Sequence, residues 1–174
     1  MKKPTWIILI VAVLVIALDQ GSKYLVTRYL PVGGAWSPFH GPLPFFQIVY
    51  TYNTGVAFGL FKDLGPVFIL IALVVVGVLI IYARKLRGDQ WLTCVALGLL
   101  LGGAIGNLVD RLRLGHVIDF IDVGVGTTRW YTSNLADVSI VLGVILLGVA
   151  MLIEEIRSKK TSKPGDTATP SVPN

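Results

Sequence analysis

Charged residues are scarce in this chain. Only 14% of its 174 residues are Asp, Glu, Lys or Arg, whereas 54% are hydrophobic, and the mean hydropathy is +0.75. This balance lies outside the range of soluble globular domains and predicts an integral membrane protein. The net charge of +5 would favour a nucleic-acid partner if the basic residues formed a patch. They cluster instead at the ends of apolar runs, as in membrane proteins, so we expect no nucleic-acid partner.

Cysteine and histidine are nearly absent, which excludes several kinds of site. The single cysteine, Cys94, lies in an apolar run, so no internal disulfide can form and we expect a small core residue. His40 and His116 are the only histidines, and no His-Glu-x-x-His motif is present. Gly-x-Ser-x-Gly, P-loop and dinucleotide-binding motifs are absent too. We expect no metal and no cofactor, and the aspartates remain as candidates for chemistry.

Four apolar runs are long enough to cross a bilayer as helices, at about residues 6–28, 65–83, 91–112 and 135–156. The first resembles a secretory signal peptide, but the sequence Leu18-Asp19-Gln20 at its end is not a small-residue cleavage site. We predict that residues 1–157 form a four-helix transmembrane domain. The Ser-, Thr- and Pro-rich residues 158–174 are expected to form a disordered cytoplasmic tail.

The distribution of Lys and Arg predicts the topology. One side of the membrane receives Lys2, Lys3, Arg84, Lys85, Arg87, Arg157, Lys159, Lys160 and Lys163, and the other Lys23, Arg28, Lys62, Arg111, Arg113 and Arg129. Because the richer side is cytoplasmic, both termini are expected inside and residues 29–64 and 113–134 outside. In the first outer segment, residues 31–44 suggest a loop, 46–52 a strand, and 56–61 a short apolar piece along the membrane surface.

Polar residues within the apolar runs are functional candidates, because charge is costly in lipid. Asp19 and Lys23 are four residues apart and share a helix face, so they can neutralise each other. Asn107 and Arg111 share a face of the third span, where they could serve either as contacts between helices or in function. The same span carries Gly98, Gly102 and Gly106, a small-xxx-small pattern that favours close helix packing.

Three aspartates fall between the last two spans. Asp119 lies in an expected surface loop, where an aspartate can simply be solvated, and Asp122 lies near turn-forming glycines. Asp137 lies in the first turn of the fourth span, where it can answer the helix dipole while Asn134 caps the helix. Asp119 and Asp137 both fall at the outer face. Our hypothesis is that they converge there as an acid/base pair.

Composition also allows two other classes of protein. A small transporter or proton channel could place Asp19, Asn107 and Arg111 between its helices. A non-catalytic membrane scaffold would account for the glycine spacing alone. Neither explains why Asp119 and Asp137 flank one outer segment.

Five motifs together resemble the lipoprotein signal peptidases, the type II signal peptidases of bacteria. They are Asp19-Gln20 with Lys23, Tyr52–Phe58 (YNTGVAF), Gly102–Arg111 (GGAIGNLVDR), Gly115–Phe120 (GHVIDF) and Asn134–Asp137 (NLAD). The motifs are in the family's order and extend over most of the chain, and only the segment after about Arg157 lies outside the resemblance.

The resemblance implies an all-α membrane bundle of four transmembrane helices, with a small extracytoplasmic β cradle and a short interfacial helix. It implies an aspartic endopeptidase of the bacterial inner membrane that cleaves prolipoproteins on the amino side of a diacylglyceryl-modified cysteine. Membrane lipids and globomycin-type inhibitors are further implied partners, and nothing requires more than a monomer. The catalytic pair maps onto Asp119 and Asp137, without an assignment of base and acid. Supporting positions map onto Asp19, Lys23, Asn53, Asn107, Arg111 and Asn134.

Overall fold

The computed structural model contains four long helices, and all of them are apolar enough to cross a membrane. It describes residues 5–39, 45–54, 65–86, 90–126 and 128–161. The helices are α1 (Thr5–Tyr29), α2 (Gly65–Ala83), α3 (Trp91–Leu114) and α4 (Leu135–Thr161). The expected four-helix membrane architecture is therefore confirmed.

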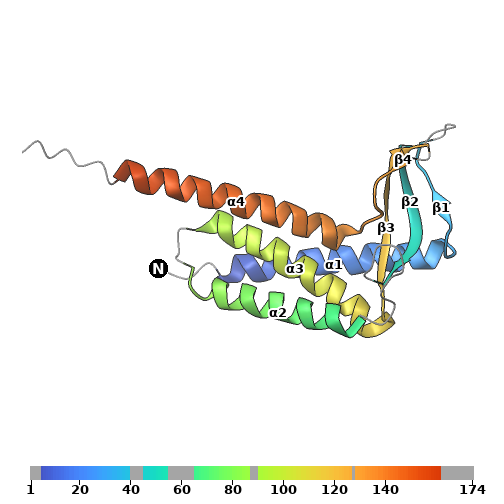
Figure 1. Cartoon of the computed structure of the whole chain (residues 1–174), viewed down its shortest axis with the longest axis horizontal. Coiled ribbons are helices and arrows are strands. Elements are labelled where there is room, and N and C mark those ends of the chain that lie inside the picture. Colours follow the sequence, from blue (N-terminus) through green and yellow to red (C-terminus); the bar gives the residue numbers. More distant parts are fainter. Residues whose placement is uncertain (1–4, 40–44, 55–64, 87–89, 127, 162–174) are drawn as a thin grey trace, which may run out of the picture.

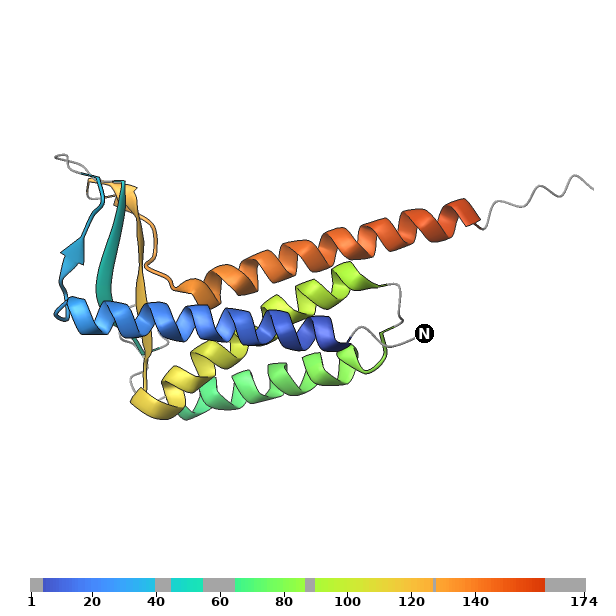
Figure 2. The ribbon, with the colours of Figure 1, turned by 180° about the vertical axis from the view of Figure 1, so that it is seen from behind.

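Helix α3 lies at the centre of the bundle and packs against the three other helices. Successive helices run in opposite directions (Figure 1). Both the start of α1 and the end of α4 consequently lie at the end of the bundle that is away from the sheet (Figures 1 and 2). The segments that follow α1 and α3 therefore meet at the other end, as the sequence predicted.

The glycines of α3 allow its neighbours to approach closely. A Cβ atom added at Gly102 would lie 2.7 Å from the Cβ of Val15 on α1, and Gly98 faces α1 in the same way. Gly103 faces α4 instead, where an added Cβ would lie 2.5 Å from the carbonyl oxygen of Ala136. Small residues thus line both interfaces, as packing in lipid requires.

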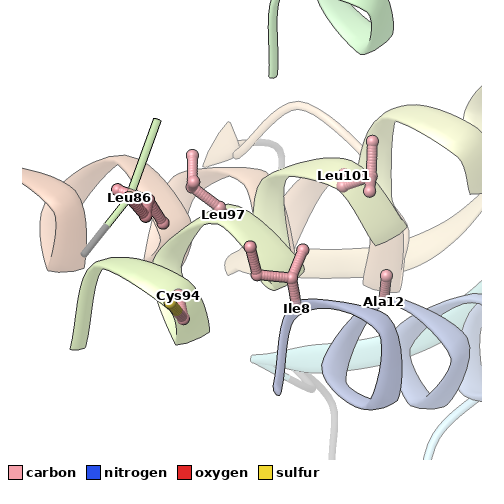
Figure 3. Packing of buried hydrophobic residues seen from close by; sticks show 6 residues of the cluster. All are labelled: Ile8, Ala12, Leu86, Cys94, Leu97 and Leu101. Atoms are coloured by element: carbon pink, nitrogen blue, oxygen red, sulfur yellow. The ribbon is translucent and has the colours of Figure 1, made fainter. Parts of the chain in front are cut away.

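A cluster of buried apolar side chains holds the far end of the bundle together. Ile8 and Ala12 of α1 meet Leu97 and Leu101 of α3, and Cys94 is completely buried among them (Figure 3). Cys94 is thus the small core residue that the sequence predicted. By contrast, α2 has no buried residue, so it presents most of its surface to the surroundings of the bundle.

An antiparallel sheet closes the other end of the bundle, in the order β1-β2-β3-β4. Its strands are β1 (Ala35–Trp36), β2 (Phe46–Asn53), β3 (Val117–Val125) and β4 (Thr128–Arg129). In the central pair, Thr51 lies opposite Asp119 and Asn53 lies opposite Val117, with an irregularity in register between Ile48 and Thr51. The two central strands thereby bring residues 66 positions apart into hydrogen-bonding contact.

The structure corrects three expectations. Asp119 does not lie in a surface loop but within β3, whose first four residues are buried. The segment expected to be a loop at 31–44 contains the short strand β1, which pairs with β2. Helix α4 continues through Thr161, so residues 158–161 are helical rather than disordered. The interfacial helix expected at 56–61, the rest of the tail and His40 lie outside the described residues.

We predict that Gly102→Ala destabilises the protein by about 1–3 kcal/mol, because the new methyl group would overpack the interface between α1 and α3. The measurement is thermal unfolding in detergent. Gly148→Ala is the matched control, since a Cβ there meets nothing within 4 Å. Equal melting temperatures for the two variants would contradict the close approach.

Candidate active site

Asp119 is held on β3 by two asparagines. Its side chain is buried, with 1% of the residue exposed. Asn53 at the end of β2 donates a hydrogen bond from Nδ2 to Oδ2 of Asp119 at 2.7 Å. Asn134 donates from Nδ2 to Oδ1 at 2.6 Å. Each carboxylate oxygen therefore receives a neutral donor, and further acceptor positions remain for a water molecule or a substrate.

Asp137 lies in the first turn of α4, and Asn134 caps this helix. The Oδ1 atom of Asn134 accepts the backbone N–H of Asp137 at 2.9 Å, which confirms the predicted N-cap. Nδ2 of Asn107, on α3, donates to Oδ1 of Asp137 at 2.7 Å. The carboxylate of Asp137 is thus fixed by its own helix and by the central helix.

Asn134 joins the two aspartates. It donates one N–H to Asp119 and the other to Oδ1 of Asn107 at 3.2 Å, while its own oxygen accepts from Asp137. Asn107 in turn donates to Asp137. These bonds fix which end of each amide is the donating nitrogen and which is the accepting oxygen. The side chains of Asn107 and Asn134 therefore form a bridge of hydrogen bonds with a defined direction. The bridge brings together the two aspartates that the sequence singled out.

A buried ion cluster lies beside this bridge. The ammonium of Lys23 is 2.8 Å from Asp19, its predicted partner, and 2.8 Å from Asp110. All three residues are at most 3% exposed. Lys23 also donates to Oδ1 of Asn107 at 3.2 Å, and Gln20 donates to Oδ1 of Asp110 at 2.8 Å. The cluster therefore connects α1 directly to the amide that orients Asp137.

Asp19 also fixes the start of α4. Its Oδ1 accepts the backbone N–H of Ala136 at 2.9 Å, next to Asp137 in sequence. This contact satisfies one of the N–H groups that a helix leaves unpaired at its first turn. Gly106 makes room for it, because a Cβ there would lie 2.7 Å from Oδ2 of Asp19. A small residue on α3 thus lets a carboxylate of α1 reach α4.

The pKa of Asp119 is raised from 3.8 to about 6, and the largest cause is burial, which penalises the charged carboxylate. The negative charge of Asp137 also contributes to this rise. The hydrogen bonds from Asn53 and Asn134 and the positive charge of Lys23 act in the opposite direction and lower it. Asp119 therefore changes protonation near neutral pH, which suits a group that exchanges protons.

Arg111 lies close to the carboxylates without forming a salt bridge to Asp119 or Asp137. Its Nη1 donates to the carbonyl oxygen of Asn107 at 3.3 Å, and its guanidinium lies over the ring of Phe68, 5.7 Å from the centroid. The charges of both aspartates act on it electrostatically. Arg111 thus contacts α2 through Phe68, and its positive charge lies within electrostatic range of both aspartates.

A cleft of about 460 Å³ opens beside Asp137. Asn53, Ser133 and Asp137 supply its polar part. Its apolar wall is formed by Val138, Val141 and Leu142 of α4 together with Trp130 and Tyr131. Val141 and Leu142 are more than half exposed, as expected for the outer surface of a membrane helix. The cleft therefore connects a carboxylate to the lipid-facing side of the bundle.

Asp122 is separate from this arrangement. Its Oδ2 accepts a hydrogen bond from Nε of Arg129 at 2.6 Å, across the β3–β4 hairpin. The ion pair holds β4 against β3. The sequence-based preference for Asp119 over Asp122 thus agrees with the geometry.

Asp110 and Tyr131 were not singled out from the sequence. Asp110 could have been found as an ionisable residue in the third span, one helical turn from Gly106 and with no assigned cation. Tyr131 carried no comparable signal. It lines the cleft beside Asp137, and burial together with the charges of Asp119 and Asp137 raises the pKa of its phenol.

Comparisons with known proteins point to one family. The family model described as signal peptidase (SPase) II matches residues 11–153. A lipoprotein signal peptidase of Geobacter sulfurreducens is 43% identical over 159 residues, which are 89% of this chain and 98% of that protein. One from Paraburkholderia phymatum is 44% identical over 141 residues, 79% of this chain and 82% of that protein.

Two solved structures, both titled as bacterial membrane enzymes determined by the in meso method, have the same fold. The one at 2.3 Å resolution has a TM-score of 0.74 and 30% identity, and the match covers 93% of this chain and 94% of that chain. The one at 1.9 Å also has a TM-score of 0.74, with 32% identity, and covers 83% of this chain and 92% of that chain. With a family model that matches residues 11–153 and relatives of about 40% identity over most of the chain, this four-helix protein belongs to the signal peptidase II family.

Proposed function

We propose that this protein removes signal peptides from bacterial prolipoproteins as an aspartic endopeptidase. The observation that carries the proposal is that one buried asparagine, Asn134, bonds both the carboxylate of Asp119 and the backbone N–H of Asp137, in a member of the signal peptidase II family. Cleavage is expected on the amino side of a diacylglyceryl-modified cysteine, as the family resemblance implies.

The proposed reaction uses the two carboxyl groups and one water molecule. Two neighbouring carboxylates do not ionise independently, so the pair holds one proton between its members. The ionised member takes a proton from the water as the water attacks the scissile carbonyl carbon. The protonated member donates its proton to the carbonyl oxygen. Collapse of the tetrahedral intermediate then breaks the C–N bond: one hydroxyl returns its proton to the carboxylate that had protonated the carbonyl oxygen, and the proton taken from the water passes to the leaving amine.

The surrounding residues are proposed to orient the pair rather than to react. Asn53 and Asn134 position Asp119, and Asn107 positions Asp137. Lys23 donates a hydrogen bond to Oδ1 of Asn107 and so fixes that amide, and Asp19 fixes the start of α4 by accepting the N–H of Ala136. Arg111 would stabilise negative charge that develops on the carbonyl oxygen, because its guanidinium lies within electrostatic range of both aspartates. No step in this mechanism requires a metal or a cofactor.

The cleft beside Asp137 fits a substrate that is partly embedded in lipid. The exposed apolar side chains of Val138, Val141 and Leu142 continue from the polar end of the cleft along the outer surface of α4. Lipid chains attached to the cysteine could remain in the bilayer while the peptide bond reaches the aspartates. We propose that the sheet forms a cradle for the peptide, and that globomycin-type inhibitors occupy the same cleft.

We place the protein in the bacterial inner membrane as a multi-pass protein, with both termini in the cytoplasm and the aspartates at the outer face. The sequence has its excess of Lys and Arg next to the start of α1, the end of α2 and the end of α4, which lie at the same end of the bundle, and this supports the orientation. A monomeric state is also part of the proposal.

We predict that Asp119→Asn and Asp137→Asn each abolish cleavage of a diacylglyceryl-modified precursor, because neither variant can share a proton between two carboxyl groups. The assay follows the size shift of the precursor with purified, membrane-inserted protein and tests its sensitivity to globomycin. Asp122→Asn is the matched control and should retain activity, since Asp122 pairs with Arg129 outside the bridge. Substantial turnover by either of the first two variants would contradict the proposal.

EDTA is expected to leave the cleavage rate unchanged, because the two carboxyl groups activate the water directly. The measurement compares initial rates before and after dialysis against EDTA. A loss of activity that zinc restores would point to a metallopeptidase.

The shared proton can be tested by infrared titration of the protonated carboxyl band, with Asp119→Asn as the reference that identifies Asp119. In the unmodified protein the band is expected to disappear as the pH rises through about 6. Asn53→Ala should raise this pKa, because it removes a hydrogen bond to the charged form. Asp137→Asn should lower it, because it removes a neighbouring negative charge. Shifts of the same sign in both variants would refute the assignment.

A further inference from the structure

The segment between β4 and α4 forms one wall of the cleft of about 460 Å³, and β3 fixes this segment in place. The chain returns along β3 from the sheet to the start of α4 (Figures 1 and 2). The backbone N–H of Trp130 donates to the carbonyl oxygen of Val123 at 2.7 Å, and that of Ser133 donates to the carbonyl oxygen of Ile121 at 3.0 Å. Tyr131 lies between these two anchored residues, so its backbone is held in position.

Tyr131 brings a hydroxyl group to this cleft, which it lines together with Asn53 and Asp137. The residue is 61% exposed, and within the described residues its hydroxyl forms no hydrogen bond. Water can therefore satisfy this hydroxyl in the free protein. A substrate that fills the cleft displaces that water and has to supply an acceptor in its place, because a buried hydroxyl without a partner is costly.

The hydroxyl of Tyr131 remains a hydrogen-bond donor at neutral pH. Burial raises the pKa of the phenol above its usual value of 10.0, and the negative charges of Asp119 and Asp137 also raise it. The phenol therefore stays protonated over the pH range in which a pair of carboxyl groups works. A protonated phenol can donate a hydrogen bond to an uncharged oxygen such as that of a carbonyl group.

Apolar side chains of α4 share the cleft with Tyr131, namely Val138, Val141 and Leu142. Val141 and Leu142 are more than half exposed, so the cleft continues onto the lipid-facing surface of the bundle. In the proposed function, the acyl chains of the substrate lie along this surface while the scissile bond lies at Asp137. The glyceryl group, with its two ester carbonyls, then lies between them in the cleft. An ester carbonyl in an apolar cleft needs a donor, and Tyr131 supplies one without adding a charge.

We propose that Tyr131 is a specificity-determining residue for the lipid-modified cysteine, and that its hydroxyl donates a hydrogen bond to an ester carbonyl oxygen of the glyceryl group. This inference rests on the proposed function, which supplies the substrate. The ester group does not change during peptide cleavage, so the contact is equally strong in the bound substrate and in the transition state. It therefore contributes to substrate binding rather than to the chemical step.

The test compares two precursors that differ only in how the chains are attached to the glyceryl group. One is the diacyl ester, and the other is a dialkyl ether of equal chain length, which has no carbonyl oxygen. The purified full chain should cleave the ester with a kcat/KM about fivefold higher, as expected for one net hydrogen bond. Tyr131→Phe should lower kcat/KM for the ester by about fivefold, chiefly through KM, and leave the ether unchanged.

Tyr24→Phe is the matched control for this substitution. It removes the same hydroxyl from a residue of similar exposure, 66%, that lines a different pocket. This variant should keep the preference for the ester. An unchanged preference in Tyr131→Phe would overturn the proposed contact. An equal loss of kcat/KM on both precursors would overturn it as well, because the hydroxyl would then act on something other than the ester.

A binding measurement separates this contact from the proposed peptidase activity. Short peptides that begin with the lipid-modified cysteine contain no scissile bond, and they can be prepared in the ester and the ether form. The unmodified protein should bind the ester form about fivefold more tightly, and Tyr131→Phe should bind both forms equally. This preference without cleavage of the precursor would refute the proposed function and support the contact. Cleavage without the preference would refute the contact alone.

Discussion

The buried ammonium of Lys23 is the interaction on which the rest of the site depends. A single charge in a poorly solvating environment is costly, and Asp19 and Asp110 offset that cost from either side. The two acids come from α1 and α3, so the ion cluster fixes both the spacing of these helices and their relative position along the bundle axis. Through Asn107 and the N–H of Ala136, the same cluster fixes both the amide that holds Asp137 and the start of α4.

This geometry is possible only because α3 is narrow where its neighbours approach. Gly102 admits Val15 of α1, and Gly106 admits the carboxylate of Asp19. Gly103 admits the first turn of α4. Burial of apolar area drives helix association weakly in lipid, so close contact and polar bonds have to supply the stabilisation. The glycines and the ion cluster are therefore two parts of one design, since the polar groups reach each other only where the backbones can approach.

The sequence was sufficient for the parts of the molecule that depend on local pattern. Hydropathy located the four spans, and residue spacing identified the Asp19–Lys23 pair, the glycine face and the Asn134 cap. It was not sufficient where partners are distant in the chain. Asp119 was expected in a loop, whereas it lies in β3. That strand pairs with β2, which joins residues 66 positions apart, and local sequence pattern does not show such pairing. The second carboxylate on Lys23, Asp110, was missed for the same reason, since one partner within the helix already satisfied the local pattern.

The choice of neutral amides around the aspartates also has a physical reason. Asn53 and Asn134 hold Asp119 with two short hydrogen bonds, yet its pKa remains raised to about 6, with burial as the largest cause. A cation in direct contact would favour the carboxylate and lower the pKa strongly. Neither cation contacts Asp119 or Asp137 directly. Lys23 donates to the side chain of Asn107, and Arg111 donates to the carbonyl oxygen of the same residue. Asparagines can thus fix the position of two acids in a membrane protein and leave the pair able to hold the proton that the proposed hydrolysis requires.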